Sequence, residues 1–381
     1  MNLTSKLPQT GTTIFAAMSA RARQYQAVNL SQGFPDFEPD PRLIRILTEV
    51  SMEGFHQYAP MQGWQALRQV LSDRIAQRDR FRYDPDREIT ITSGATQALF
   101  SAAHAMIHPG DEVILFSPAY DCYEPGIRLA GGKPVYVPLS FPDFAINWAQ
   151  LEQVINANTR GIFVNHPHNP SGATLSMEDL DRLAQICKKH ELWLISDEVY
   201  EYMVYDDKPH HSVASHPELR ARSVVISSFG KTLHVTGWKV GYCLAPSAMM
   251  AEIRKVHQFT TFSVPTPFQV AISRYLREEP EKVDGLSRFY QAKRDLFVNM
   301  LAETKFEPLE CKGTYFQLAT YDNIKDCSDQ VFAQWLPQAV GVACIPISVF
   351  YPDQQDHRVV RFCFAKKDDT LRAAIARLSA L

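Results

Sequence analysis

Residues 88–117 read EITITSGATQALFSAAHAMIHPGDEVILFS, and this stretch decides the fold class. A short β-branched run at 88–92 is followed by a long alanine-rich run, which ends before the Pro-Gly pair at 109–110. A second short apolar run then occupies 111–117. Short β-branched runs predict strands, and the longer amphipathic run between them predicts a helix. The stretch therefore predicts a strand–helix–strand unit.

The same alternation continues toward the C-terminus. Short apolar runs bounded by polar residues at 161–167, 192–198 and 223–228 are typical of buried parallel strands. A helix is predicted over 177–190, between the first two of them. The pattern indicates an α/β sheet that is covered by helices.

After about residue 280 the pattern changes, and one long charged helix is predicted over 281–303. Further strands, followed by a terminal helix, are predicted over 314–320, 342–348 and 359–365. This mixture indicates a separate α+β unit, with which the turn-rich N-terminal residues are expected to pack. We therefore expect a large domain at 41–282 and a small domain formed by 1–40 and 283–381.

The composition is that of an ordinary globular protein, with 45% hydrophobic and 21% charged residues among 381. A net charge of −3 gives no reason to expect nucleic acid or a membrane surface as partner, so a small-molecule substrate is expected. The seven cysteines are scattered and include no C-x-x-C pair, which argues against a disulfide framework. No signal peptide or membrane-spanning run is recognised, so a cytoplasmic protein is expected.

Candidate functional residues follow the predicted strands, because ligands of open α/β sheets bind beyond the carboxyl ends of the strands. After the first strand, Gly94, Ala95 and Thr96 stand at the start of a helix. Free backbone N–H groups and the helix dipole suit a phosphate there, although such residues also serve simply as helix caps. The interpretation depends on what the other strand ends carry.

Four more strand ends carry Tyr120, Asn169, Asp197 and Lys231. Each has an alternative structural role: a core aromatic, a turn residue, a helix cap or a structural ion pair. His166 and His168 form an H-x-H pair, but without further ligands the pair predicts no metal site.

Together these side chains describe a site for pyridoxal 5′-phosphate. Lys231 supplies the amine that forms a Schiff base with the aldehyde, and Asp197 keeps the pyridine nitrogen protonated. Asn169 and Tyr200 are placed to hydrogen-bond the phenolate oxygen. Two residues that flank Lys231 suit a dianionic phosphate, namely Ser228 and Lys239.

Arg361 is the single charge in the apolar run VVRFCFA, 359–365. A guanidinium in such a run needs an anion, and it binds a carboxylate through two hydrogen bonds. The alternative is an arginine on an edge strand that reaches solvent. With a cofactor that works on amino acids, the α-carboxylate of a substrate is the favoured partner.

With these residues in place, the chain resembles the class I/II, fold-type I pyridoxal-phosphate aminotransferases. It is most similar to the branch that contains bacterial methionine aminotransferases and the kynurenine/glutamine transaminases. The resemblance implies a large cofactor-binding domain around a mostly parallel seven-stranded sheet, and a smaller α+β domain. The stretches that carry it run in the family's order along nearly the whole chain: NLSQGFPDF (29–37), QYAPMQGWQALR (57–68), TSGATQALF (92–100), NHPHNPSG (165–172), SDEVYE (196–201), SSFGKTLHVTGWKVGY (227–242) and VRFCFAKKDDTL (360–371).

The resemblance also implies roles for individual residues. Lys231 would bind the cofactor and then move the proton between the substrate Cα and the cofactor, while Tyr120 would stack on the ring. Arg361, with Asn169 and the backbone of Gly33, would hold the substrate carboxylate. The tyrosine that reaches the phosphate of a neighbouring subunit corresponds to Tyr58, which implies a homodimer with shared active sites.

The substrate pocket is expected to be apolar and aromatic, because no second arginine is placed for a side-chain carboxylate. Phe15 stands where the kynurenine-type relatives carry a tryptophan, and Phe262 and Ser263 stand where they contribute an aromatic residue and a histidine. The expected donors are methionine, phenylalanine, tyrosine, leucine, histidine, glutamine or kynurenine, with a 2-oxo acid as acceptor.

Two other functions stay open at this point. A cysteine-S-conjugate β-lyase would use the same scaffold, and a non-catalytic sensor of the same fold would need a fused DNA-binding module. A nicotinamide-dependent dehydrogenase would need G-x-G-x-x-G after the first strand, where the sequence has S-G-A-T-Q instead.

Overall fold

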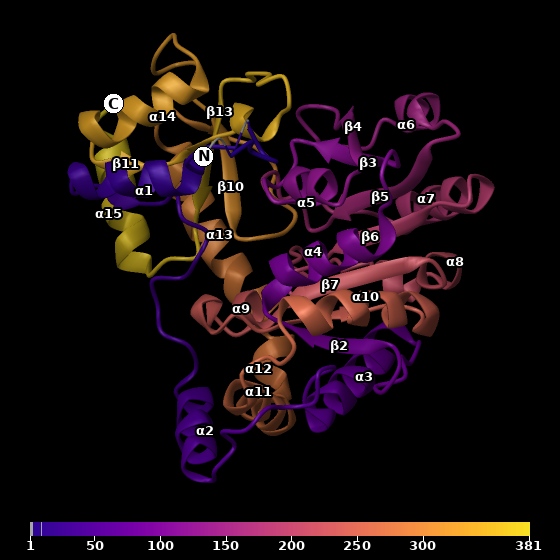
Figure 1. Cartoon of the computed structure of the whole chain (residues 1–381). Helices are drawn as coiled ribbons and strands as arrows, with labels where there is room; N and C mark the ends of the chain where they lie inside the picture. Colours follow the sequence, from indigo (N-terminus) through magenta and orange to yellow (C-terminus); the bar gives the residue numbers. More distant parts are fainter. Residues whose placement is uncertain (1–2, 9) are drawn as a thin grey trace.

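A seven-stranded sheet lies at the centre of the computed structural model, which describes residues 3–8 and 10–381 (Figure 1). β8 runs antiparallel to both of its neighbours, and every other neighbouring pair is parallel. The prediction of a mostly parallel seven-stranded sheet is thus confirmed. The spatial order is β2 (Ile89–Thr92), β8 (Gly241–Leu244), β7 (Ser223–Ser228), β6 (Trp193–Asp197), β5 (Thr159–Asn165), β3 (Glu112–Ser117) and β4 (Lys133–Pro138).

Helices cover both faces of this sheet. In β3, Val113 and Leu115 enter one apolar cluster while Ile114 and Phe116 enter another, as the two-residue period of a strand requires. The first cluster is closed by α4 (Gly94–Met106), α5 (Tyr123–Leu129) and α10 (Ser247–Thr260). The second face is covered by α6 (Trp148–Val154), α7 (Met177–Lys189) and α8 (Pro217–Arg220).

Local sequence explains where α7 begins and ends. Ser176 accepts a hydrogen bond from the backbone N–H of Asp179, whose carboxylate accepts one in return from the N–H of Ser176. Basic side chains at Lys188 and Lys189 stand in its last turn, where they complement the helix dipole.

A second, four-stranded antiparallel sheet lies in the left part of Figure 1. Its order is β12 (Ile345–Pro346), β13 (Val359–Cys363), β10 (Phe316–Thr320) and β9 (Glu307–Pro308). The helices in this part are α1 (Ile14–Gln24), α13 (Leu286–Ala302), α14 (Asp329–Ala339) and α15 (Asp368–Leu378).

The two ends of the chain meet in this part of the molecule. β1 (Val28–Asn29) pairs in parallel with β11 (Val342–Ala343), and the N–H of Cys363 donates to the carbonyl of Leu30. The N-terminal residues therefore contribute to the packing around the four-stranded sheet. The division of the chain at residues 41 and 283 into two domains stays a prediction.

Two predicted elements differ in detail. The helix expected over 281–303 is divided at Gly285 into α12 (Pro280–Asp284) and α13, because glycine is a poor helix former. The strand expected over 342–348 is two short strands, β11 and β12, which belong to different sheets.

The remaining helices pack together at the β2 side of the large sheet. α2 (Pro41–Met52) packs on α11 (Thr266–Glu278), which in turn packs on α3 (Gln65–Asp79). Short helical segments at α9 (Phe229–Thr232), η1 (Val213–Ser215), η2 (Thr236–Trp238) and η3 (Ser348–Phe350) complete the described structure.

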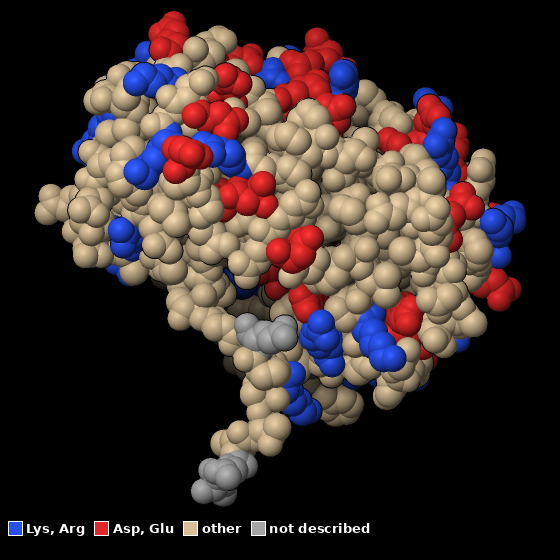
Figure 2. Space-filling view, turned by 90° about the horizontal axis from the view of Figure 1, so that it is seen from above, with Lys and Arg blue, Asp and Glu red and all other residues tan. Residues whose placement is uncertain are grey.

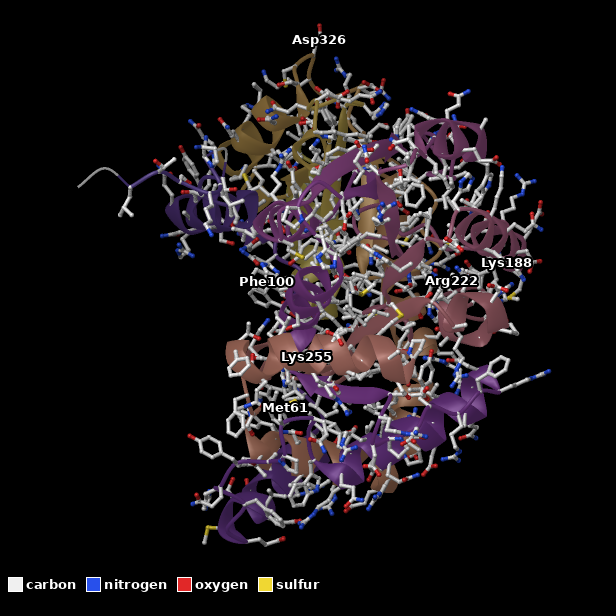
Figure 3. All side chains as sticks on the ribbon, turned by 45° about the vertical axis from the view of Figure 1, so that its right-hand side comes forward. Met61, Phe100, Lys188, Arg222, Lys255 and Asp326 are labelled. Carbon is white, nitrogen blue, oxygen red and sulfur yellow. The ribbon has the colours of Figure 1, made fainter. Side chains whose placement is uncertain are left out.

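Charged side chains of both signs lie on the surface of the molecule. Acidic and basic side chains are interspersed on the face that Figure 2 shows, without a large area of one sign. Lys188 and Arg222 lie on the same side of the molecule in Figure 3, and both form ion pairs with Glu218. Among the described residues, every helix is too short or too polar to cross a membrane.

Candidate active site

The carboxyl edge of the large sheet brings distant parts of the sequence together. Asn165 and Asp197 are register partners at the ends of β5 and β6. Thr92 and Ser228 both pair with Gly241, which begins β8. Because β8 runs in the opposite direction, its start lies at the same edge as the ends of β2 and β7.

A cavity of about 290 Å³ lies at this edge. Its wall contains both the residues that follow the strands and residues from the four-stranded sheet and the N-terminal segment. Twelve of the sequence-predicted site residues line it: Phe15, Gly33, Ala95, Thr96, Tyr120, Asn169, Asp197, Tyr200, Ser228, Lys231, Lys239 and Arg361.

Lys231 projects into this cavity from α9, directly after β7. Its Nζ donates to the carbonyl of Gly33 at 3.0 Å and to the hydroxyl of Tyr315 at 2.8 Å. Burial lowers the pKa of Lys231 to about 8, with smaller contributions from Arg361 and Lys239. A substantial share of this amine is therefore neutral, and hence nucleophilic, near neutral pH.

Asp197 lies at the end of β6 and is almost fully buried. Its carboxylate accepts a hydrogen bond from the hydroxyl of Tyr123 at 2.7 Å and one from the N–H of Val199 at 3.3 Å. Burial raises the pKa of Asp197 to about 6, although these two hydrogen bonds act in the other direction. Among the described residues no cation forms an ion pair with this carboxylate, so a cationic ring nitrogen suits it.

One end of the cavity has the features of an anion site. Ala95 and Thr96 stand in the first turn of α4, where backbone N–H groups have no partner within the helix. A Cβ on Gly94 would lie 3.2 Å from Nζ of Lys239, which places that ammonium group against the same turn. Within the described residues Lys239 has no carboxylate partner, so a phosphate would fit between these donors.

Arg361 occupies the other end of the cavity and is 1% exposed. It lies in β13 between β12 and β10, so it is not an edge residue that reaches solvent. Its Nη1 donates to Oδ1 of Asn169 at 2.5 Å and its Nη2 to the carbonyl of Ser31 at 3.3 Å. Nε has no hydrogen-bond partner among the described residues, and no carboxylate there forms an ion pair with the guanidinium.

Aromatic rings surround this arginine. The guanidinium carbon lies 3.8 Å from the centroid of the Phe316 ring, 5.3 Å from that of Phe15 and 5.7 Å from that of Phe350. A buried guanidinium among aromatic rings, with unused donors and no counter-ion, is suited to bind a carboxylate that comes from outside the chain.

Four sequence-predicted site residues do not line the cavity. Gly94 lies behind its wall, against Lys239. Tyr58 is 81% exposed and contacts the ring of Phe262, which is also exposed, at 5.2 Å between centroids. The hydroxyl of Ser263 donates to the carbonyl of Ala59. Within one chain the last three form a surface cluster beside α10 and α11.

Sequence reasoning missed several residues that hold the predicted ones in place. Tyr123 binds the carboxylate of Asp197, and the side-chain amide of Asn165 donates to its backbone carbonyl. Tyr315 binds Lys231, and it also donates to the carbonyl of Gly33 at 2.5 Å. The sequence signal for Tyr123 and Asn165 is position: Asn165 lies near the end of the strand predicted over 161–167, and Tyr123 lies in the segment that follows the strand predicted over 111–117.

Comparisons with known proteins agree with this geometry. The model of a family described as aminotransferase class I and II matches residues 25–378. The chain is 49% identical over 377 residues to methionine aminotransferase of Escherichia coli (strain K12), covering 99% of this chain and 98% of that protein. It is 33% identical to kynurenine–oxoglutarate transaminase 1 of Mus musculus, covering 94% and 92% of the two chains.

A solved structure also matches the whole chain closely. The crystal structure of an Escherichia coli protein identified as having a methionine aminotransferase function superposes with a TM-score of 0.98. The two are 48% identical, and the match covers 100% of both chains.

Proposed function

The chain belongs to the class I and II aminotransferases and is an enzyme that exchanges an amino group between an amino acid and a 2-oxo acid, and from this we propose that its preferred donors are L-amino acids with apolar or aromatic side chains, methionine foremost. The observation that carries the proposal is the unpaired, buried guanidinium of Arg361 in the same cavity as the amine of Lys231.

Members of the family use pyridoxal 5′-phosphate, and we propose that this chain binds it with the residues of the cavity. When bound, the cofactor supplies an aldehyde for the amine and an electron-withdrawing ring that stabilises charge at the substrate Cα. Asp197 would hold the ring nitrogen, Tyr120 would stack on the ring, and Asn169 and Tyr200 would donate to its phenolate oxygen. The phosphate would be held by Gly94, Ala95, Thr96, Ser228 and Lys239.

The residues of the chain would divide the remaining work. Arg361 binds the α-carboxylate of the substrate and so fixes the Cα relative to Lys231. The amine of Lys231, with its pKa lowered to about 8, accepts a proton from the substrate and returns it. Tyr123 and Val199 keep the carboxylate of Asp197 in position by hydrogen bonds.

The donor preference rests on the charges that line the cavity. Its cationic side chains, among the described residues, are Lys231, Lys239 and Arg361, and each has a role assigned above. A side-chain carboxylate would therefore find no cation, whereas Phe15 and Phe316 offer aromatic surface. Methionine, phenylalanine, tyrosine and leucine fit this wall, as do the neutral groups of glutamine, histidine and kynurenine.

We also propose that the active form is a homodimer in the cytoplasm. Tyr58, Phe259 and Phe262 are exposed aromatic residues near one another in sequence or space, and such a surface is suited to a second copy. Tyr58, Phe262 and Ser263 would then complete the neighbouring subunit's site. All seven cysteines are unpaired, which suits a reducing compartment.

The half-reaction tests this proposal. The purified holoenzyme is mixed with single amino acids, and the loss of the aldehyde form of the cofactor is followed by absorbance as pyridoxamine phosphate appears. We expect methionine and the aromatic amino acids to react faster than aspartate and glutamate. A faster reaction with the acidic pair would overturn the donor assignment.

Covalent trapping tests the chemistry separately. Borohydride treatment of the holoenzyme should leave the cofactor on Lys231, as measured by peptide mass spectrometry. Lys231→Ala should lose turnover by roughly a thousandfold or more, while Lys208→Ala, in an exposed turn, keeps it. Pyruvate and ammonia formed from a cysteine conjugate without a 2-oxo acid would instead indicate the β-lyase.

A further inference from the structure

A cluster of three metal-ligating side chains lies outside the cavity described above. One ligand atom from each of His166, Glu198 and His210 can be chosen so that all three lie within 4.8 Å of one another. His166 follows β5, Glu198 follows β6, and His210 comes from the loop before η1. The H-x-H pair at 166–168 lacks further ligands in the sequence, and folding supplies them from two other segments.

Only one histidine of that pair belongs to the cluster. The imidazole of His168 is engaged elsewhere, at 2.7 Å from the hydroxyl of Ser171 and 3.0 Å from the carbonyl of Pro118. His166 is different: it is 1% exposed, and neither of its ring nitrogens has a hydrogen-bond partner among the described residues. A buried imidazole without a partner is costly unless something binds it.

The unused imidazole points toward the carboxylate of the cluster. Nε2 of His166 lies 3.4 Å from Oε1 of Glu198 without forming a hydrogen bond, and Nε2 of His210 lies 2.7 Å from Oε2. Oε1 is itself held by the hydroxyl of Ser196 and the N–H of Val213. Such supporting hydrogen bonds orient a metal-binding carboxylate.

We propose that His166, Glu198 and His210 bind a divalent transition-metal ion, and that Zn²⁺ matches the site best. Two imidazole nitrogens and one carboxylate oxygen form a donor set that zinc accepts in proteins, with a fourth position left for water. On binding, the ion takes the place of the proton between Nε2 of His210 and Glu198, and the neutral imidazole carries its one proton on Nδ1 instead.

The ion and the water would enter from a cavity that borders the site. His166 also lines a second cavity of about 630 Å³, together with Asn165, His168 and His211. The ion would join the ends of β5 and β6, which carry Asn165 and Asp197, to the loop that holds His210. Its role would be to fix the edge on which the cofactor-binding residues stand.

Metal analysis tests the site. The holoenzyme is used because bound cofactor occupies the active-site cavity, whose polar groups then do not bind the added metal. The protein is stripped with a chelator, loaded with Zn²⁺ or Co²⁺, and dialysed. We expect one ion per chain by elemental analysis, and visible absorption bands of Co²⁺ typical of four nitrogen and oxygen ligands. Retention of less than about one tenth of an ion per chain would overturn the proposal.

Two variants distinguish a metal-binding role of His166 from a purely structural role. His166→Leu removes one ligand with little change in volume, and it should weaken Zn²⁺ binding by at least about 100-fold. His211→Asn changes the neighbouring histidine, whose ring is not in the cluster, and should bind the ion as before.

Thermal unfolding gives a readout that does not depend on turnover. Zn²⁺ should raise the Tm of the unchanged chain and of His211→Asn, and should leave that of His166→Leu unmoved. In chelator the Tm of His166→Leu should be no lower than that of the unchanged chain, because the imidazole it replaces has no partner. An equal Zn²⁺ shift in all three proteins would contradict the assignment.

Discussion

At the scale of single residues, the site depends on charges that the protein buries without their counter-ions. Asp197 and Arg361 are buried and Lys231 is partly buried, and none of the three forms an ion pair within the described residues. Burial penalises the charged form of each, so these groups are suited to bind a charged cofactor and a charged substrate.

The reactivity of Lys231 should follow its lowered pKa. Below about pH 8 most of the amine is protonated, and only its neutral fraction can attack an aldehyde; above about pH 8 the neutral form dominates. The rate at which the apoenzyme takes up pyridoxal phosphate should therefore rise with pH and level off above about 8. Stopped-flow absorbance measures this rate. The control is N-acetyl-lysine amide, whose rate should keep rising up to about pH 10.5, the ordinary pKa of a lysine amine.

Arg361 should control substrate binding and leave the cofactor in place. Arg361→Leu removes the proposed carboxylate partner, so kcat/KM for methionine should fall by about 100-fold or more. The affinity for pyridoxal phosphate, from fluorescence titration, should change little. Arg358→Gln, three residues earlier in an exposed ion-pair cluster, is the matched control and should retain kcat/KM. Equal losses in both variants would contradict the role.

At the scale of elements, the antiparallel strand β8 is the feature that sequence patterns did not reveal. It is four residues long and begins two residues after Lys239. β4 was also not predicted, because Pro134 and Pro138 interrupt it, and prolines are tolerated there since β4 is an edge strand. The five longer runs read as strands at 88–92, 111–117, 161–167, 192–198 and 223–228 are confirmed as β2, β3, β5, β6 and β7.

The close approach of β8 to α4 can be tested at a glycine. A Cβ on Gly241 would lie 2.7 Å from the carbonyl of Ser227 and 3.0 Å from the nitrogen of Ala95, both backbone atoms that cannot move aside. Gly241→Ala should therefore destabilise the protein by about 1–3 kcal/mol and weaken cofactor binding. Gly237→Ala, with open space around its Cβ, should stay within about 0.5 kcal/mol. Urea unfolding and cofactor titration measure both.

Site residues could be predicted from the sequence where they stand at or just after the end of a strand. Contacts between side chains that only the fold brings together could not. Asp197 and Asn169 could be read from the strand ends that they follow. The contact of Tyr315 with Lys231 joins positions far apart in the sequence, and no local pattern indicates it. Nor could the sequence tell that Arg361 would lie between two strands, since the order of the strands in the sheet decides that.

At the scale of the whole molecule, the exposed cluster around Tyr58 and Phe262 predicts the assembly. Sedimentation equilibrium should give a mass twice the 43.2 kDa of one chain. Tyr58→Ala should weaken pyridoxal phosphate binding, because each site would then lack a donor from its neighbour. Tyr25→Ala, at the end of α1 beside the four-stranded sheet, serves as control and should bind the cofactor normally.

Mixed dimers make that prediction sharper. Lys231→Ala and Tyr58→Ala chains are combined under conditions that allow subunits to exchange. A shared site predicts that each mixed dimer has one site with both residues intact, so that activity reappears on mixing. Continued absence of activity, with exchange proved by differently tagged chains, would place Tyr58 and Lys231 in independent roles.

The pairing of β1 with β11 has a consequence for how the protein is made. Val28 leaves the ribosome long before its partner Val342. β1 therefore stays unpaired while the entire seven-stranded sheet is synthesised. The residues that would hold pyridoxal phosphate are therefore complete while Arg361 is still to be translated. On the proposed assignment, a nascent chain would have its cofactor-binding residues before the arginine that binds the substrate, and β13 and α15 would be added last.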